Sequence, residues 1–103
     1  MNPNMWYVYK MLSQIPIRIE KLSKDKIDME LLRVGMIAEL DAVNLYEQLA
    51  AATDNENLKK VFLDIAKEEK THFGEFQALL LKLDKEQVEE LEKGKEEVEE
   101  LIG

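Results

Sequence analysis

The stretch from Leu58 to Leu83, LKKVFLDIAKEEKTHFGEFQALLLKL, decides the fold of this chain. Apolar side chains recur in it at intervals of three and four residues, which is the period of one face of an α-helix. The positions on this face are Leu58, Val61, Phe62, Ile65, Glu69, His72, Phe73, Phe76, Leu79, Leu80 and Leu83. Two of them, Glu69 and the chain's only histidine, His72, are ionisable. The pattern predicts a long helix whose inward face carries a carboxylate and an imidazole one turn apart.

A second long helix is predicted upstream, from a cap at Ser23 to about Thr53. Its apolar face also carries a carboxylate, Glu39, and the face is completed by Leu32, Met36, Val43, Tyr46 and Ala50, with Ile37 and Leu40 widening it. The break between the helices is Thr53-Asp54-Asn55, and Thr53 with Glu56 has the spacing of a capping box. Two long helices joined by so short a turn form an antiparallel hairpin.

The ends of the chain differ from this hairpin. Asp84 and Gln87 repeat the cap spacing, which predicts a third, shorter helix over roughly residues 85–101. It is mostly acidic, typical of a solvated surface, and its thin apolar edge suggests docking on another subunit. Residues 1–22 are predicted to be an irregular arm, strand-like at Met5–Tyr9, that either packs on a neighbour or is a disordered tail. Residues 23–103 then form one helical domain.

Composition and charge exclude several classes of function. The 103 residues include 22 acidic and 14 basic side chains and no cysteine, for a net charge of -8. Disulfides, iron–sulfur clusters and thiolate zinc sites are excluded, and the negative charge argues against nucleic acid or an anionic membrane as a partner. No apolar run approaches the length of a membrane span, and residues 1–27 lack a secretory signal pattern. We expect a cytoplasmic protein, or one in a compartment within the cytoplasm.

The hairpin geometry brings the ionisable residues of the two inward faces together. Glu39 and Glu69 lie equally far from Asp54, so both sit roughly 22 Å from the hairpin tip and face each other. His72 is one turn further along, opposite Met36. Burying unpaired charge is expensive, and a bound metal is the simplest compensation. The alternatives are a core histidine bonded to a backbone carbonyl and a surface Glu39.

One chain carries half of a dinuclear site. Carboxylate-bridged di-iron bundles use a Glu from each of two helices and a Glu-x-x-His from each of two others, and this chain holds one of each. A symmetric dimer would supply four carboxylates and two imidazoles, a set that suits iron or manganese. We therefore expect an all-α fold, an antiparallel two-helix hairpin plus a short C-terminal helix, dimerising into a four-helix bundle.

The runs IAELDAVNLYEQ, residues 37–48, and EEKTH, residues 68–72, resemble the encapsulated ferritins, short ferritin-like proteins loaded inside encapsulin nanocompartments. The resemblance covers residues 30–102. It implies a ferritin-like bundle with a di-iron ferroxidase centre between two chains, ligated by Glu39, Glu69 and His72, with Tyr46 beside the iron. It also implies a ring built from several dimers, an encapsulin shell protein as partner, and a location within the nanocompartment.

The sequence departs from the family at a few positions. Leu45 stands where some members have tryptophan, and Ala38 replaces one of the acidic residues that line a route for incoming metal. Asp41 matches another residue of that route. The chain ends at Gly103 without the short tail that docks free-standing members to the shell. We expect that the tail has been removed or that this is the cargo domain of a longer shell fusion.

The predicted function is ferroxidase activity, the oxidation of Fe(II) by O2 at a shared di-iron centre that feeds iron storage inside an encapsulin shell. The predicted catalytic residues are Glu39, Glu69, His72 and Tyr46, with Asp41 as a possible access residue. One alternative is a peroxide-reducing protein like rubrerythrin, although that class usually couples to a cysteine-ligated iron centre. The other is a helical assembly module without catalytic activity, which should bind no transition metal.

Overall fold

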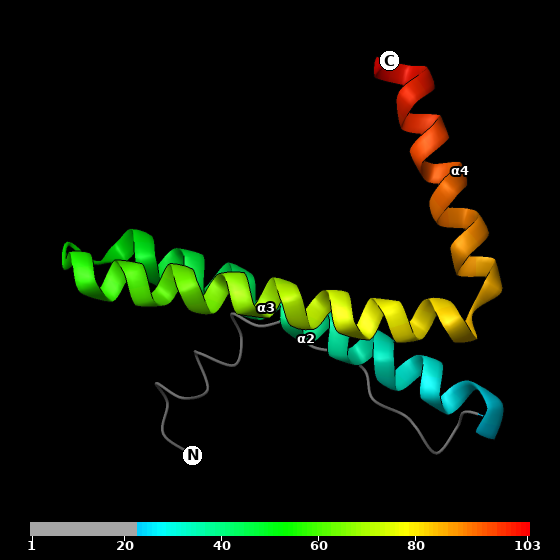
Figure 1. The fold of residues 1–103 in the computed structure, drawn as a ribbon, viewed down its shortest axis with the longest axis horizontal. Helices are drawn as coiled ribbons and strands as arrows, with labels where there is room; N and C mark the ends of the chain where they lie inside the picture. The colour runs from blue at the N-terminus through cyan, green and yellow to red at the C-terminus, as the bar shows by residue number, and fades with distance from the viewer. Residues whose placement is uncertain (1–22) are drawn as a thin grey trace, which may run out of the picture.

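The computed structural model describes residues 23–103, and every element in this range is a helix (Figure 1). Helix α2 spans Lys24–Ala52, α3 spans Glu56–Leu83 and α4 spans Lys85–Ile102. The predicted all-α class is confirmed, with bounds that agree within a residue or so of those expected. The arm expected at residues 1–22, including the strand-like Met5–Tyr9, lies outside the described residues.

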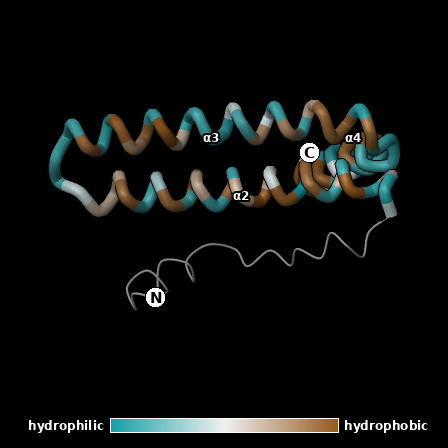
Figure 2. Tube along the Cα trace, turned by 90° about the horizontal axis from the view of Figure 1, so that it is seen from below, coloured by the Kyte–Doolittle hydropathy of each residue, from teal (hydrophilic) through white to brown (hydrophobic). Residues whose placement is uncertain are grey.

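Helices α2 and α3 lie antiparallel and side by side over nearly their whole length, and α4 leaves the end of α3 at a steep angle (Figures 1 and 2). The two long helices have 29 and 28 residues, so each is about 42 Å long at 1.5 Å per residue. None of the described helices is long and apolar enough to cross a membrane.

The cap at the start of α3 differs from the prediction. Asn55, rather than Thr53, is the N-cap: its side-chain oxygen accepts hydrogen bonds from the backbone N–H groups of Asn57 and Leu58 at 2.9 and 3.2 Å. Thr53 instead ends α2 and uses its Oγ1 to accept the N–H of Asn55 at 3.1 Å. The predicted Thr53–Glu56 capping box is therefore wrong, because Asn caps as well as Thr and stands one position before the helix. Ser23 is the N-cap of α2, but without a side-chain hydrogen bond.

The corner between α3 and α4 consists of one residue, Asp84. Its N–H donates to the carbonyl of Leu80 at 2.8 Å and ends α3, while its Oδ1 accepts the N–H of Gln87 at 3.0 Å and begins α4. The predicted cap at Asp84 is confirmed. Its Oδ2 also accepts from Arg33 Nη2 of α2 at 2.8 Å, a contact across 51 positions of sequence that the local pattern does not predict. The hydrogen bond from Gln87 and the pairing with Arg33 hold the pKa of Asp84 below its ordinary value.

The interior of the hairpin is thin. The fully buried apolar residues are Val43, Ala50, Ala66 and Leu80, and no large side chain in the described range is completely enclosed. Many large apolar side chains are exposed instead, and brown, hydrophobic stretches run along both long helices (Figure 2). Two helices form only two layers, so much of each apolar face is left without cover. A domain of this size needs a larger core, which a second copy would provide.

The exposed apolar side chains fall on two flanks of the hairpin. The His72 flank contains His72 together with Leu31, Leu58, Val61, Leu79 and Leu83, and Leu31, Leu79 and Leu83 share one shallow hollow. The groove flank contains the exposed Ile37 and Leu40 and the half-buried Leu81, which line a groove that α4 also borders. Leu79 and Leu81 are two residues apart, so they project from α3 about 200° apart. The two flanks are thus on nearly opposite sides of the hairpin.

Candidate metal centre

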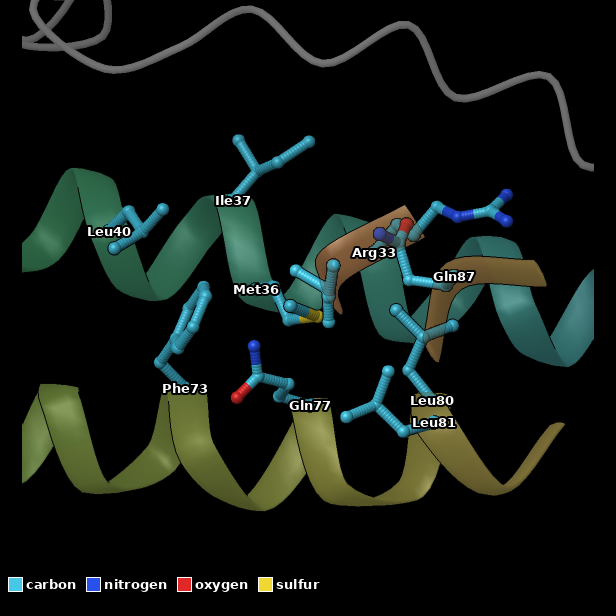
Figure 3. Close-up of a pocket in the computed structure, with 10 residues that line it drawn as sticks. Arg33, Met36, Ile37, Leu40, Phe73, Gln77, Leu80, Leu81 and Gln87 are labelled. Carbon is cyan, nitrogen blue, oxygen red and sulfur yellow. The ribbon is translucent and has the colours of Figure 1, made fainter. Parts of the chain in front are cut away.

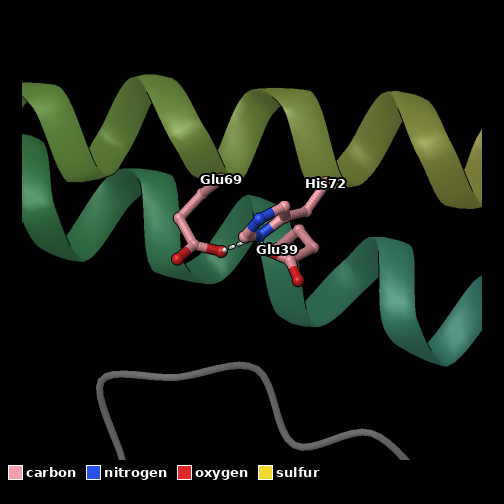
Figure 4. Close-up of side chains that lie close together, drawn as sticks. All are labelled: Glu39, Glu69 and His72. Carbon is pink, nitrogen blue, oxygen red and sulfur yellow. Dashed lines mark hydrogen bonds and ion pairs between the residues drawn. The ribbon is translucent and has the colours of Figure 1, made fainter.

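Glu39 of α2 and Glu69 and His72 of α3 converge between the two long helices (Figure 4). Each residue offers one potential ligand atom, and these atoms all lie within 4.8 Å of one another. Backbone register alone would leave His72 one turn away from Glu39. The gap closes because side chains lean toward the N-terminus of their own helix. In an antiparallel pair, that lean carries Glu39 and His72 toward each other.

His72 Nδ1 is the central atom of the group. It lies 3.4 Å from Oε2 of Glu69 and 3.5 Å from Oε2 of Glu39. The contact to Glu69 joins residues one turn apart on α3, and the contact to Glu39 crosses to α2. Both distances are at the long end for hydrogen bonds. The side chains point at a common space without closing it.

The carboxylate of Glu39 is only partly satisfied. Its side chain is 16% exposed, and its Oε2 is shielded from solvent without a hydrogen-bond partner in the described part of the chain. Buried polar atoms almost always find a partner, so an exception calls for an explanation. A cation held between Glu39, Glu69 and His72 supplies one. The oxygen and imidazole donors suit iron or manganese, so the residues present fit a metal of this kind.

The group is open on one side. The side chains of Glu39 and Glu69 are 16% and 19% exposed, whereas that of His72 is 47% exposed. His72 belongs to the flank defined by exposed apolar side chains, which continues the same line of α3 in both directions. Among residues 23–103, nothing closes this side of the site, and the apolar surface around it is exposed as well.

Two packing contacts flank the group along the hairpin. On the side toward the tip, the rings of Tyr46 and Phe62 stack with centroids 6.4 Å apart. On the other side, Phe76 lies against the backbone of Gly35, where an added Cβ would stand 3.1 Å from the ring. The Gly35–Phe76 contact joins α2 to α3 about one turn from Glu39, and the Tyr46–Phe62 contact does so about two turns from it. They fix the separation of the helices at the height of the site.

Tyr46, Asp41 and Glu68 lie near the three converging residues in the sequence but do not belong to the group. Tyr46 is on the inner face of α2, but no hydrogen bond links it to the three converging residues in the described range. Asp41 is partly buried on α2 and lies outside this group. Glu68, next to Glu69 in sequence, is exposed and also lies outside it. A role for Tyr46 or Asp41 remains a prediction.

A comparison with protein-family models gives one match. The model described as rubrerythrin matches residues 30–102, which contain all of α3 and α4 and α2 from residue 30 onward. A search of solved structures finds the crystal structure of the encapsulated ferritin domain from Pyrococcus furiosus. The two chains have 55% sequence identity and a TM-score of 0.77, over 89% of this chain and 96% of that one.

Two curated proteins are also similar. The ferritin-like-encapsulin shell fusion protein of Pyrococcus furiosus is 63% identical over 75 residues, which are 73% of this chain and 22% of that protein. An encapsulin nanocompartment cargo protein of Myxococcus xanthus is 43% identical over 56 residues, 54% of this chain and 43% of that protein. The chain thus spans less than half the length of either curated relative.

The helical hairpin with a carboxylate–carboxylate–histidine group between its helices defines the ferritin-like class of proteins. The chain belongs to the rubrerythrin family and, within it, to the encapsulated ferritins.

Proposed function

We propose that this protein is a ferroxidase in which two copies share one di-iron centre at their His72 flanks. The observation that carries the proposal is the buried Oε2 of Glu39, which has no hydrogen-bond partner among the described residues and points toward Glu69 and His72. Each chain supplies two carboxylates and one imidazole, which is half of the ligand set of a carboxylate di-iron site. Membership of the rubrerythrin family supports the same metal.

The chain's own residues would perform distinct tasks at this centre. Glu39 and Glu69 would provide the negative charge that favours Fe(III) over Fe(II), and His72 would add a neutral nitrogen donor, with Nδ1 as the ring atom that faces both carboxylates. Glu69, whose Oε2 lies 3.4 Å from Nδ1 of the same histidine, would hold the metal together with His72 from α3. The ferrous ions, when bound, each supply one electron for the reduction of dioxygen. Tyr46, held by its stacking on Phe62, is a candidate neighbour of the ligands.

The apolar side chains around His72 support a pairing of two copies through this flank. Leu79 and Leu83 are 52% and 51% exposed, and Leu58 and Val61 are 47% and 55% exposed. A two-fold axis through the flank would cover them, close the open wall of the site and complete a four-helix bundle. Without metal, four carboxylates near that axis repel one another, so metal binding and pairing are expected to be coupled.

The proposed setting is the interior of an encapsulin shell, within a ring of dimers. One relative is named as a fusion to an encapsulin shell and the other as a cargo of an encapsulin nanocompartment, which supports the same setting here. A two-layer hairpin encloses no space for a mineral. The division of labour would therefore be oxidation by this chain and storage by the shell.

Anaerobic titration with Fe(II), followed by native mass spectrometry, tests the shared centre. We expect a species of two chains with two iron ions to replace smaller species as Fe(II) is added, and a chelator to reverse the change. Oxidation kinetics after admission of air should then follow the amount of this species. A stable single chain that binds no Fe(II), or that binds two ions by itself, would refute the shared centre.

A second experiment tests the division of labour. The isolated protein is given excess Fe(II) in air, and soluble protein is separated from precipitate. We expect turnover of Fe(II) with most Fe(III) in the precipitate, and soluble iron when a shell protein is present. A large mineral load that remains soluble with this protein alone would show that it stores iron like a ferritin cage.

A further inference from the structure

The metal group lies between two layers of the hairpin in which the long helices pack closely. On the side toward the tip, the adjacent layer contains Val43 of α2 and Ala66 of α3, and both are buried. On the other side, the adjacent layer contains Gly35 of α2 and Phe76 of α3, which touch. The separation of the two helices at the metal group therefore depends on the residues of these two layers.

Gly35 allows an unusually close approach of the Phe76 ring. A Cβ at Gly35 would stand 3.1 Å from both Cδ2 and Cε2 of that ring, whereas carbon atoms in ordinary contact are about 3.5–4.0 Å apart. Glycine is unfavourable within a helix, and none of the described glycines has the positive φ that would require it. The approach of the ring is thus the structural feature that calls for glycine at this position.

The neighbouring side chains on the groove flank have more freedom to move. Met36 of α2 and Phe73 of α3 are directed into the groove of about 380 Å³ between the helices (Figure 3). Side chains that border free space can adjust when the helices shift. The Phe76 ring, by contrast, rests on the backbone of Gly35. This contact therefore determines how closely α2 and α3 approach on this side of the metal group.

The separation set by this contact extends to the ligands. Gly35 precedes Glu39 by one turn on α2, and Phe76 likewise follows the histidine by one turn on α3. A wider helix pair would lengthen the 3.5 Å distance from Glu39 Oε2 to His72 Nδ1. An added Cβ needs a shift of roughly 0.5 Å to reach ordinary contact, while metal–ligand distances tolerate roughly 0.2 Å. The required shift exceeds that tolerance.

We propose that Gly35 is a positioning residue of the metal centre, and that its contact with Phe76 holds the helices at a separation that favours small divalent ions over larger ones. Small ions such as Zn²⁺ bind nitrogen and oxygen at about 2.0–2.2 Å, and larger ones such as Ca²⁺ bind oxygen at about 2.3–2.6 Å. A wider site should lose affinity for small ions first. The inference rests on the proposed function, because it takes Glu39, Glu69 and His72 as the ligands.

The test compares the binding of Zn²⁺ and Cd²⁺, which have the same charge and a filled d shell but differ in size, to metal-free protein at one protein concentration. Gly35→Ala should lower the affinity for Zn²⁺ by roughly tenfold and that for the larger Cd²⁺ by roughly twofold at most. Competition with a chromophoric chelator measures both affinities, and His72→Ala gives the background binding of the acidic surface. Urea denaturation of metal-free Gly35→Ala should show no loss of stability, so weaker binding does not reflect unfolding.

Two further variants show whether the effect depends on the Phe76 ring. Gly74→Ala adds the same methyl group to α3, two residues from His72, where nothing in the described range lies within 4 Å of it. This matched control should leave both affinities unchanged. In a Phe76→Leu background, where the side chain is smaller, Gly35→Ala should change the affinity for Zn²⁺ by less than roughly twofold.

Three results would overturn the proposal. Equal affinities of wild type and Gly35→Ala would show that the contact does not position the ligands. Equal losses for Zn²⁺ and Cd²⁺ would show that it does not select by size, and an undiminished loss in the Phe76→Leu background would show that the ring is not responsible. Failure of the proposed function gives a different result, in which the wild type binds Zn²⁺ no better than His72→Ala, and that result would overturn both.

Discussion

Two polar groups join α2 to α3, and they are satisfied to different degrees. At the α3–α4 corner, the carboxylate of Asp84 accepts from Arg33 at 2.8 Å and from the N–H of Gln87 at 3.0 Å. In the middle of the hairpin, Glu39 shares one histidine with Glu69 at 3.4–3.5 Å, and its Oε2 accepts no hydrogen bond in the described range. At the corner, the carboxylate of Asp84 is paired with the cationic side chain of Arg33. In the central group, two carboxylates are paired only with one histidine.

The difference separates a structural role from a functional one. A carboxylate with a cation and a backbone donor stabilises the fold without any further partner. A carboxylate left without a partner in the interior raises the energy of the chain until something binds to it. Two carboxylates beside a single imidazole carry an excess of negative charge, and such an excess is expected at a site that binds a cation.

Removal of the central ligands should have the largest effect. Glu39→Ala, Glu69→Ala and His72→Ala should each slow Fe(II) oxidation by at least roughly 100-fold, because each one removes a ligand from both halves of a shared centre. Stopped-flow absorbance of the Fe(III) product measures the rate. Glu68→Ala is the matched control, because Glu68 adjoins Glu69 but is exposed and lies outside the group. Equal losses in the Glu68 and Glu69 variants would show that the site has been assigned to the wrong face of α3.

The two groups should respond to charge removal with opposite signs in the metal-free protein. Glu39→Gln replaces a half-buried carboxylate, whose Oε2 accepts no hydrogen bond in the described range, with a neutral group that can donate to Glu69, and we expect it to stabilise by roughly 1–3 kcal/mol. Asp84→Ala removes both a helix cap and the partner of Arg33, and it should lower the melting temperature. Thermal melts in chelator measure both effects. Destabilisation by Glu39→Gln would mean that Glu39 is satisfied in the apo protein.

Acid should weaken the corner in a defined direction. The hydrogen bond from Gln87 and the pairing with Arg33 lower the native pKa of Asp84 below its ordinary value of 3.8. The unfolded chain therefore takes up this proton at higher pH than the native chain does. The stabilisation is complete above the ordinary pKa and is lost as the pH falls through the lowered native value. Melts of wild type and Asp84→Asn between roughly pH 5 and pH 2 should converge at the acid end; parallel curves would contradict the assignment.

Glycine substitutions should give the smallest effect. A glycine within a helix costs roughly 1 kcal/mol relative to alanine. An added Cβ meets nothing within 4 Å at Gly94 but stands 3.1 Å from the Phe76 ring at Gly35. Gly94→Ala should therefore stabilise by about that amount, and Gly35→Ala by less, because Phe76 must shift beside the metal group. Chemical denaturation measures both, and an equal gain at the two positions would mean that the Gly35–Phe76 approach imposes no constraint.

Much of the fold could be predicted from the sequence because it depends on patterns among residues that are close together in the chain. The period of the apolar residues gives both long helices, and Asp84 with Gln87 gives the corner. The convergence of Glu39, Glu69 and His72 could be anticipated because an antiparallel hairpin with a short turn has one free parameter, the position of its tip. That argument needs only the helical rise.

The remaining features depend on geometry that no local pattern contains. The choice of Asn55 over Thr53 as the cap depends on how the backbone leaves α2. The pairing of Arg33 with Asp84 depends on the direction of α4, and Arg33 alone among many exposed charges gives no signal of it. The groove likewise arises only when three helices are in place. Sequence reasoning finds the residues that repeat along a helix and misses those that meet across a corner.

The small size of the buried core has a consequence for where the activity can occur. With Ala50 and Ala66 among the few fully buried residues of the described range, these helices gain little from folding alone, and the proposed pairing of two copies would make their stability depend on concentration. Dilution should then unfold the chain and expose it to proteases, whereas confinement at high local concentration should protect it. Under the proposed function, a chain that dissociated from its partner would thus lose its fold and its ferroxidase activity together. Oxidation of Fe(II) would then occur only where the protein is concentrated, and no inhibitor would be needed to prevent it elsewhere.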